Sequence, residues 1–225
     1  MTVMSPVARR LLKRKEFKKY IKKCIRGDIE WKDKKLSPMK SALRIILRKE
    51  QNETCVYCQR LITIERRNTQ EDIEHYLDKS KPHYRKYTFS PINLVLSCHT
   101  CNFVKSTKDI GGPTLRGGGY VSLQSRDFRW PHPYIDDIEK CIVKLRGPVY
   151  EIVPGSGKEV ESENMIEDLR LNDIANIESR EAYLKSRNFK IMDIVSDFVS
   201  SNNNSVRLRT KRLIEESRAI QKEIY

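Results

Sequence analysis

The sequence predicts an α+β protein in which a small zinc-stapled core of strands and one helix carries mainly helical N- and C-terminal extensions. Two Cys-x-x-Cys pairs, Cys55/Cys58 and Cys98/Cys101, bracket the core. Short apolar runs between the pairs indicate strands, and the flanking segments have apolar residues at helical spacing. We therefore divide the 225 residues into a basic helical region, a core and a C-terminal region, with the boundaries 1–52, 53–110 and 111–225.

The N-terminal region carries most of the net charge of +14. Residues 1–50 contain 17 Lys and Arg but only 5 Asp and Glu, whereas residues 151–225 contain 12 and 14. Such asymmetry predicts a polyanionic partner, namely nucleic acid, that is contacted mainly by the N-terminal part. The alternative is a solvated basic helix face.

Two helices are expected in this region. Residues 6–26 should form a basic helix that begins at a proline, and residues 37–51 a second one. On the second helix, Lys40, Arg44 and Arg48 follow one another at a spacing of four residues, which suits a phosphate backbone.

The chain has no apolar run of the ~18 residues that a membrane span requires. Its N-terminus lacks the apolar central region of a secretory signal. We therefore expect a cytoplasmic protein without a membrane partner, in which cysteines remain reduced.

The four paired cysteines are interpreted as one structural zinc site. Four thiolates are the preferred ligands of a closed, tetrahedral zinc ion. A Cys-x-x-Cys turn directs two sulfurs at one ion, and the two turns are separated by 39 residues. Disulfides or unrelated buried thiols are the alternatives, but two matched pairs in a reducing compartment favour zinc.

The expected order of elements between the cysteines is strand, loop, strand and helix. Strands are predicted at 61–64, 70–76 and 93–96, and a helix from 98 to about 107. A polar surface loop that includes Lys79 should connect the second and third strands.

Glu74 and His75 end the second predicted strand. A neutral histidine can take a proton from water near pH 7, and a divalent ion can neutralise charge at a scissile phosphate. Adjacent strand residues point to opposite faces, so both side chains face one site only if the strand ends or bends there. Taken singly, they read as an exposed carboxylate and a satisfied surface histidine.

Residues 55–108 resemble the HNH endonuclease family, whose ββα-metal, treble-clef-like fold holds a catalytic ion between a hairpin and a helix. Glu74-His75, Asn93 and Asn102 match the three elements of the family pattern. The resemblance implies that His75 is the general base and that Asn93 orients it. Glu74 and Asn102 would help to hold Mg²⁺ or another divalent ion. Glu74 stands where Asp is commoner, and Asn102 stands where the family name has His.

The ending CN-x-x-K of the same family pattern is matched by Asn102 and Lys105, which implies a phosphate contact for this lysine. We group Lys105 with Arg44, Arg48 and Lys79 as candidate substrate-binding residues.

A closer similarity covers more of the chain. The segments LRIILRKEQNETCVYC, IEHYLDKSK and NLVLSCHTCNFVKSTK are similar to the HNH nuclease subunits of Septu-type antiphage systems and of retrons that carry an ATPase. HPYIDD and MIEDLRLND are similar more weakly. The similarity implies an antiviral defence role and an SMC- or ABC-like ATPase partner that docks on the C-terminal half. In a retron, the partners would also include a reverse transcriptase and its RNA–DNA.

The C-terminal region is expected to contain two long helices, at 177–200 and 207–224. Ile191, Val195 and Phe198 would bury against the nuclease core, while apolar residues of the last helix need a partner surface in this chain or another. The segment containing His132, Asp136 and Asp137 could supply a ligand or a substrate contact, but such a turn is more often only a rigid corner.

These observations predict a metal-dependent endonuclease, with DNA expected over RNA although nothing in the sequence reads a 2′-OH. The alternatives are a non-catalytic zinc-knuckle module that binds nucleic acid, and an adaptor for an ATPase. A binding module needs the cysteines and the basic patch but not His75, Asn93 and Asn102.

Overall fold

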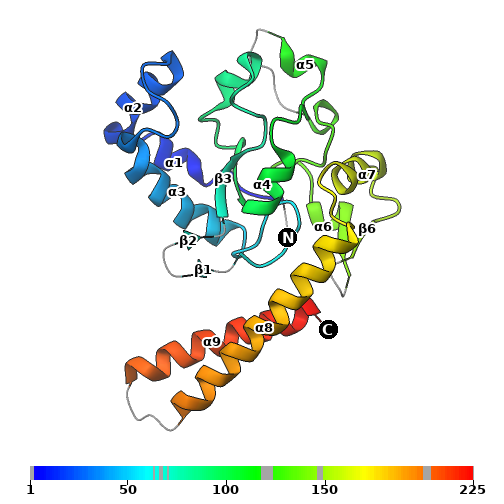
Figure 1. The fold of residues 1–225 in the computed structure, drawn as a ribbon. Coiled ribbons are helices and arrows are strands. Elements are labelled where there is room, and N and C mark those ends of the chain that lie inside the picture. The colour runs from blue at the N-terminus through cyan, green and yellow to red at the C-terminus, as the bar shows by residue number, and fades with distance from the viewer. Residues whose placement is uncertain are drawn as a thin grey trace. The chain divides into compact units, whose positions relative to one another are not determined.

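The protein has a mixed α+β structure with small sheets, as predicted (Figure 1). The computed structural model describes residues 3–62, 64–65, 68–69, 71–117, 124–145, 149–199 and 204–224. The chain forms two compact units. The first comprises Met1–Ile142 and Ile152–Leu169, and the second comprises Val143–Glu151 and Arg170–Tyr225. The first unit thus contains both the basic region and the cysteine-bracketed core.

The predicted helix at 6–26 is instead two helices, α1 (Ala8–Leu12) and α2 (Lys15–Arg26), so the prediction of one continuous helix is wrong. The backbone is extended at Arg14, with ψ 136°. The break allows α1 to bury three apolar side chains against α3 (Ser37–Glu50), the predicted second helix. A short 3-10 helix, η1 (Lys34–Leu36), leads into α3.

The predicted order of strand, loop, strand and helix is confirmed. β3 (Glu71–His75) pairs antiparallel with β4 (Leu94–Cys98), in a register that runs from Glu71↔Cys98 to His75↔Leu94. α4 (His99–Lys105) follows β4 directly. The loop between the strands contains a 3-10 helix, η2 (Pro82–Tyr87), that buries two tyrosines.

The first predicted strand, at 61–64, is shorter and lies later in the chain. β1 (Ile64–Glu65) pairs with β2 (Asn68–Thr69). Leu61 makes only an isolated bridge with Thr54, across the turn that carries the first two cysteines. Residues that the apolar pattern assigns to a strand therefore belong to this turn.

Short helices complete the first unit: α5 (Pro113–Arg116), η3 (Ser125–Asp127), α6 (Ile138–Cys141) and α7 (Glu159–Asp168). Its core is aromatic, with Trp130 lying edge-on to Tyr57 and Tyr76. Gly111 is tightly packed, because a Cβ there would lie 2.2 Å from the hydroxyl of Tyr84.

β5 (Ile142–Lys144) pairs with β6 (Tyr150–Ile152), and the unit boundary falls within this two-stranded sheet.

The second unit contains two long helices, α8 (Ile174–Val199) and α9 (Asn204–Ile224), that lie side by side (Figure 1). They share a hydrophobic core, to which α8 contributes Leu184, Ile191 and Val195 and α9 contributes Ile220 and Ile224. The expectation that Ile191 and Val195 bury against the nuclease core is therefore wrong, because α9 covers them. None of the helices that the structure describes combines the length and apolar character needed to cross a bilayer.

Candidate functional site

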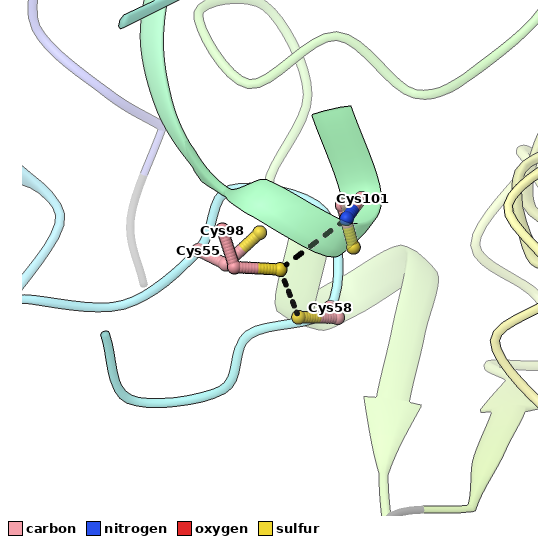
Figure 2. A group of neighbouring side chains, drawn as sticks. All are labelled: Cys55, Cys58, Cys98 and Cys101. Carbon is pink, nitrogen blue, oxygen red and sulfur yellow. Dashed lines mark hydrogen bonds between the residues drawn. The ribbon is translucent and has the colours of Figure 1, made fainter. Parts of the chain in front are cut away.

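The four paired cysteines form one cluster (Figure 2). Cys55 and Cys58 lie in the turn after α3, Cys98 ends β4, and Cys101 lies in the first turn of α4. All four sulfur atoms lie within 4.8 Å of one another. The Sγ atoms of Cys58 and Cys98 are 3.8 Å apart. Zn–S bonds of about 2.3 Å place tetrahedral sulfurs about 3.8 Å apart, so the cluster fits a zinc ion.

Backbone hydrogen bonds fix the first cysteine turn against β4. Gln59 adopts a left-handed conformation, with φ 53°, and its N–H donates to the carbonyl of Cys55 at 2.9 Å. The N–H of Cys55 donates to the carbonyl of Arg60 at 2.9 Å, which closes the turn. The N–H of Val56 donates to the carbonyl of Leu96 in β4 at 3.1 Å. The turn is therefore held beside the strand that carries Cys98.

The thiols of the cluster perturb one another. Hydrogen bonds from Cys101, Cys55 and Cys98 hold the pKa of Cys58 well below its usual range. Burial raises the pKa of Cys55, and the hydrogen bonds with the other thiols raise that of Cys101. The cluster thus stabilises a thiolate at Cys58, and the thiolate is the form that binds a metal.

His75, the last residue of β3, has a buried side chain in which one nitrogen lacks a hydrogen-bond partner among the described residues. Its ring lies edge-on to Trp31, with the ring centroids 4.5 Å apart. The imidazole hydrogen-bonds to the backbone of Thr88, while Nε2 has no hydrogen-bond partner among the described residues. Burial holds the pKa of His75 well below 6.5, and the charges of Lys79 and Lys105 act in the same direction. The imidazole is therefore neutral at neutral pH.

Glu74 faces the other side of β3, as the alternation of a strand requires. Its carboxylate accepts a hydrogen bond from Lys105 Nζ at 2.5 Å, and the same Nζ donates to the carbonyl of His75 at 3.1 Å. Both side chains are buried. Burial raises the pKa of Glu74, and the ion pair with Lys105 opposes that rise. Lys105, a candidate for phosphate contact, is thus engaged with Glu74 inside the protein.

Asn93 connects the two ends of the loop between β3 and β4. Its Oδ1 accepts from the N–H of Leu77 at 2.6 Å, and its Nδ2 donates to the carbonyl of Leu77 at 3.1 Å. The same Nδ2 also donates to the carbonyl of Tyr87 at 3.1 Å. The side chain is buried, so these bonds replace water for backbone groups on both sides of the loop.

Asn102 lies on α4 opposite Asp72 of β3. Its Nδ2 donates to Asp72 Oδ2 at 2.9 Å, and His99 Nδ1 lies 2.9 Å from the same oxygen. Asp72 and Glu74 are two residues apart and both contact α4. Sequence reasoning missed Asp72, although its i, i+2 spacing from Glu74 on a strand was the available signal.

The carboxylates and the amide on this side of β3 are oxygen donors of the kind that Mg²⁺ and other hard cations prefer. The chemistry of the donor set therefore fits a divalent ion. Lys105 is the cation that now contacts Glu74, so an ion bound to this carboxylate has to displace the ammonium group.

The basic row on α3 contacts protein groups. The carboxylate of Glu71, buried in β3, pairs with Arg48, whose Nη2 and Nε lie 2.7 Å and 3.0 Å from its oxygens. Arg44 Nε lies 3.8 Å from the same carboxylate. Lys40 donates to the carbonyl of Trp31 at 3.2 Å. These contacts connect α3 to β3 and to the segment before η1, so the row is largely engaged within the protein.

A cleft of about 770 Å³ is lined by two neighbours of His75, although His75 itself is not among its lining residues. Its walls include Trp31 and Thr88, the two residues that contact the His75 ring, together with Lys79 and Arg85. Of the four candidate substrate-binding residues, Lys79 is the one that lines this cleft. Sequence reasoning missed Trp31 and Arg85, since no spacing relative to the cysteines distinguishes them.

His132 and Asp136 form a rigid corner. The ring of His132 is buried between Tyr76 and Phe128, with centroids at 4.5 Å and 4.3 Å. Burial lowers the pKa of His132 to about 3. Asp136 accepts from the N–H of His132 at 2.7 Å. Asp137 precedes α6 and lies 3.9 Å from Lys140.

Comparison with family models, with characterised proteins and with solved structures gives no match for this chain. The functional argument therefore depends on the chemistry of the residues described above.

Proposed function

We propose that the protein is a metal-dependent endonuclease of the HNH type, which hydrolyses phosphodiester bonds in nucleic acid. The observation that supports this best is the buried Nε2 of a neutral His75, which has no hydrogen-bond partner among the described residues. Two residues that contact the His75 ring, Trp31 and Thr88, line a cleft that contains cationic side chains. A general base needs an unprotonated nitrogen that is not already bonded to protein.

In this proposal, His75 Nε2 takes the proton of the attacking water. The hydrogen bond between the imidazole and the backbone of Thr88 fixes the ring, so the open nitrogen keeps one direction. Asn93 acts as a positioning residue, because it holds the loop that carries Thr88 and Lys79. Lys79 is available to a phosphate oxygen at the cleft.

Glu74 and Asn102 would hold a divalent ion, with Asp72 as a further oxygen donor. An ion held there would supply positive charge to a phosphate bound on that face of β3, which is the face opposite to His75. Lys105 is buried and paired with Glu74, so it would reach a phosphate only if an ion took its place at that carboxylate.

The experiment is a cleavage assay on single-stranded DNA, double-stranded DNA and RNA. Protein with verified zinc content is tested without added divalent ion, with Mg²⁺ or Mn²⁺, and after chelation of the added ion. We expect cleavage that requires the added ion and is lost in His75→Ala, and we expect DNA to be the better substrate. His83→Ala is the matched control, since His83 contacts Tyr84 and lies 4.0 Å from Asp109, does not line the cleft and has no role in the proposal. Equal turnover in His75→Ala and the intact protein would remove His75 from the mechanism.

A zinc-knuckle protein that binds nucleic acid without cleaving it is the second candidate. Two observations favour it. The Glu74 carboxylate is already paired with Lys105, and the Trp31 ring packs edge-on against the His75 ring. Binding without cleavage under every metal condition of the assay would select this function. An adaptor that binds only an ATPase would show neither binding nor cleavage.

We further propose a role in antiviral defence together with an SMC- or ABC-like ATPase, and, in a retron, with a reverse transcriptase and its RNA–DNA. The support is the similarity of the segments around the cysteines and Glu74-His75 to nuclease subunits of Septu-type and ATPase-carrying retron systems. The exposed apolar residues Phe189 on α8 and Leu208 on α9 suit a protein partner.

A further inference from the structure

We infer that the cleft beside His75 binds an unpaired nucleotide, with its base stacked on Trp31 and its phosphates at Lys79 and Arg85. The inference deepens the proposed nuclease function, since it names the state of the substrate, a single-stranded segment of DNA or RNA.

The cleft has the size and the wall that a nucleotide needs. Its volume of about 770 Å³ lies within the roughly 300–1,000 Å³ typical of ligand pockets. Trp31 is half-buried and held in place, because its ring contacts His75 at 4.5 Å and Phe89 at 5.6 Å between centroids. Its carbonyl accepts from Lys40 at 3.2 Å. Lys40 Nζ lies over the indole ring, 5.8 Å from its centroid. A fixed indole in a cleft wall is a platform for base stacking.

The cleft is cationic. Within the part of the chain that the structure describes, Lys79 and Arg85 form no ion pair, so both charges are available to an anion. The third cation in the wall, Lys32, lies 3.1 Å from Glu30, which is the carboxylate among the lining residues. Two uncompensated cations beside an aromatic ring match a base with its flanking phosphates.

The backbone around the cleft is adapted to Arg85. Gly27 ends α2 in the left-handed region, with φ +92°, and a Cβ there would lie 2.7 Å from the Arg85 guanidinium. Glycine therefore allows the guanidinium to lie close to the main chain at the cleft wall.

The geometry selects unpaired nucleotides for a physical reason. In a duplex, both faces of a base are covered by its neighbours, whereas an unpaired base exposes a face that can stack on an aromatic side chain. A base on this platform is separated from the proposed general base by the indole of Trp31, which contacts the His75 ring.

Tryptophan fluorescence tests the inference, because the chain contains two tryptophans and Trp130 is fully buried. Full-length protein without added divalent ion is titrated with a single-stranded 12-mer of DNA, the same sequence as RNA, and a DNA duplex. We expect the single strands to quench the emission and the duplex to bind with little quenching. Trp31→Phe in the same background should abolish the change. Comparison of the DNA and RNA strands distinguishes the two sources of the nucleotide.

Affinities give a second, independent readout. Trp31→Leu should weaken single-strand binding by roughly tenfold or more. The double variant Lys79→Gln/Arg85→Gln should reduce the salt dependence of binding, while Lys18→Gln, an exposed position on α2 that does not line the cleft, should leave the affinity nearly unchanged. If Trp31→Leu loses zinc or is destabilised, the double variant still tests the cleft, because it leaves Trp31 unchanged.

Unchanged single-strand affinity in the double variant, or equal quenching by duplex and single strand, would overturn the inference. Absence of cleavage with intact quenching would instead refute the nuclease function and leave the nucleotide cleft in place.

Discussion

Asn93 and the backbone of Leu77 exchange two hydrogen bonds, one in each direction, at 2.6 Å and 3.1 Å. A third bond from the Asn93 amide reaches the carbonyl of Tyr87. Only an amide supplies both an acceptor for an N–H and donors for two carbonyls at one buried position. The loop beside His75 therefore depends on this side chain for its shape.

Replacing Asn93 by Asp or Ala should destabilise the protein and remove cleavage. Asn93→Asp places a carboxylate against two carbonyl oxygens, and Asn93→Ala leaves buried backbone groups without partners. We expect a loss of about 2–4 kcal/mol in the free energy of unfolding for Asn93→Ala. Denaturant titration measures it, with Asn164→Ala as control, since Asn164 makes one long bond of 3.5 Å at an exposed site. If Asn93→Ala loses less free energy of unfolding than the control, the Asn93 side chain does not hold the loop.

Lys105 and Glu74 should behave as a coupled buried pair. Lys105→Met leaves a carboxylate buried and uncompensated, which costs about 3–5 kcal/mol, whereas Lys105→Met/Glu74→Gln should cost much less than the two single changes added. The exposed pair of Lys185 and Glu181, at 2.6 Å, is the control, and its Lys185→Met variant should cost less than about 1 kcal/mol. If the double variant loses as much free energy of unfolding as Lys105→Met and Glu74→Gln together, the ion pair is contradicted.

Zinc should depend on the four clustered cysteines and not on the other two. Cys98→Ser is expected to reduce bound zinc from one ion per chain to nearly none and to make the core sensitive to protease, because a structural ion contributes folding free energy directly. Cys141→Ser, at a buried cysteine outside the cluster, should keep full zinc. Elemental analysis decides, and intact protein without zinc would exclude the site.

Acid should destabilise the protein through His132. Its folded pKa is about 3, below the ~6.5 of an unfolded histidine, so the unfolded chain binds the extra proton. The stability is complete above pH 6.5 and is lost as the pH falls toward 3. Between pH 7.5 and 5.0, the intact protein should lose about 2 kcal/mol more than His132→Phe. Equal losses in denaturant titrations at the two pH values would mean that His132 is protonated in the folded state.

Docking of an ATPase should depend on the exposed apolar residues of α8 and α9. Phe189→Asp and Leu208→Asp change side chains that are 75% and 62% exposed, so the helical hairpin should stay folded while co-purification with an ATPase encoded beside it is lost. Ile45→Asp on α3, at 71% exposure, is the matched control and should retain the partner. Retention by all three variants would place the docking surface elsewhere.

Local patterns were sufficient to predict the cysteine cluster and the order of strand, loop, strand and helix. The Cys-x-x-Cys spacing fixes each turn, and short apolar runs mark β3 and β4. The opposite directions of Glu74 and His75 also followed from strand alternation alone. A sequence pattern captures these features because each depends on residues that are close along the chain.

Contacts between distant segments were not predictable in this way. The pairing of Arg48 with Glu71 spans 23 residues, and the contact between Trp31 and His75 joins segments more than 40 residues apart. From the sequence alone, Arg44 and Arg48 on α3 could equally well have faced solvent. The break at Arg14 likewise depends on how α1 packs on α3, which helical periodicity does not encode.

The contact between Cys58 and Cys98 joins positions 40 residues apart in the chain. Closing a loop of this length in a disordered chain costs roughly 3 kcal/mol of conformational free energy. A zinc ion that binds before β3 and β4 pair would make this closure in advance, and the strands would then meet across a much shorter effective separation. Hairpin formation on a newly synthesised chain would in that case be faster when zinc is plentiful, and a chain made in zinc-poor conditions would spend longer exposed to proteases and aggregation.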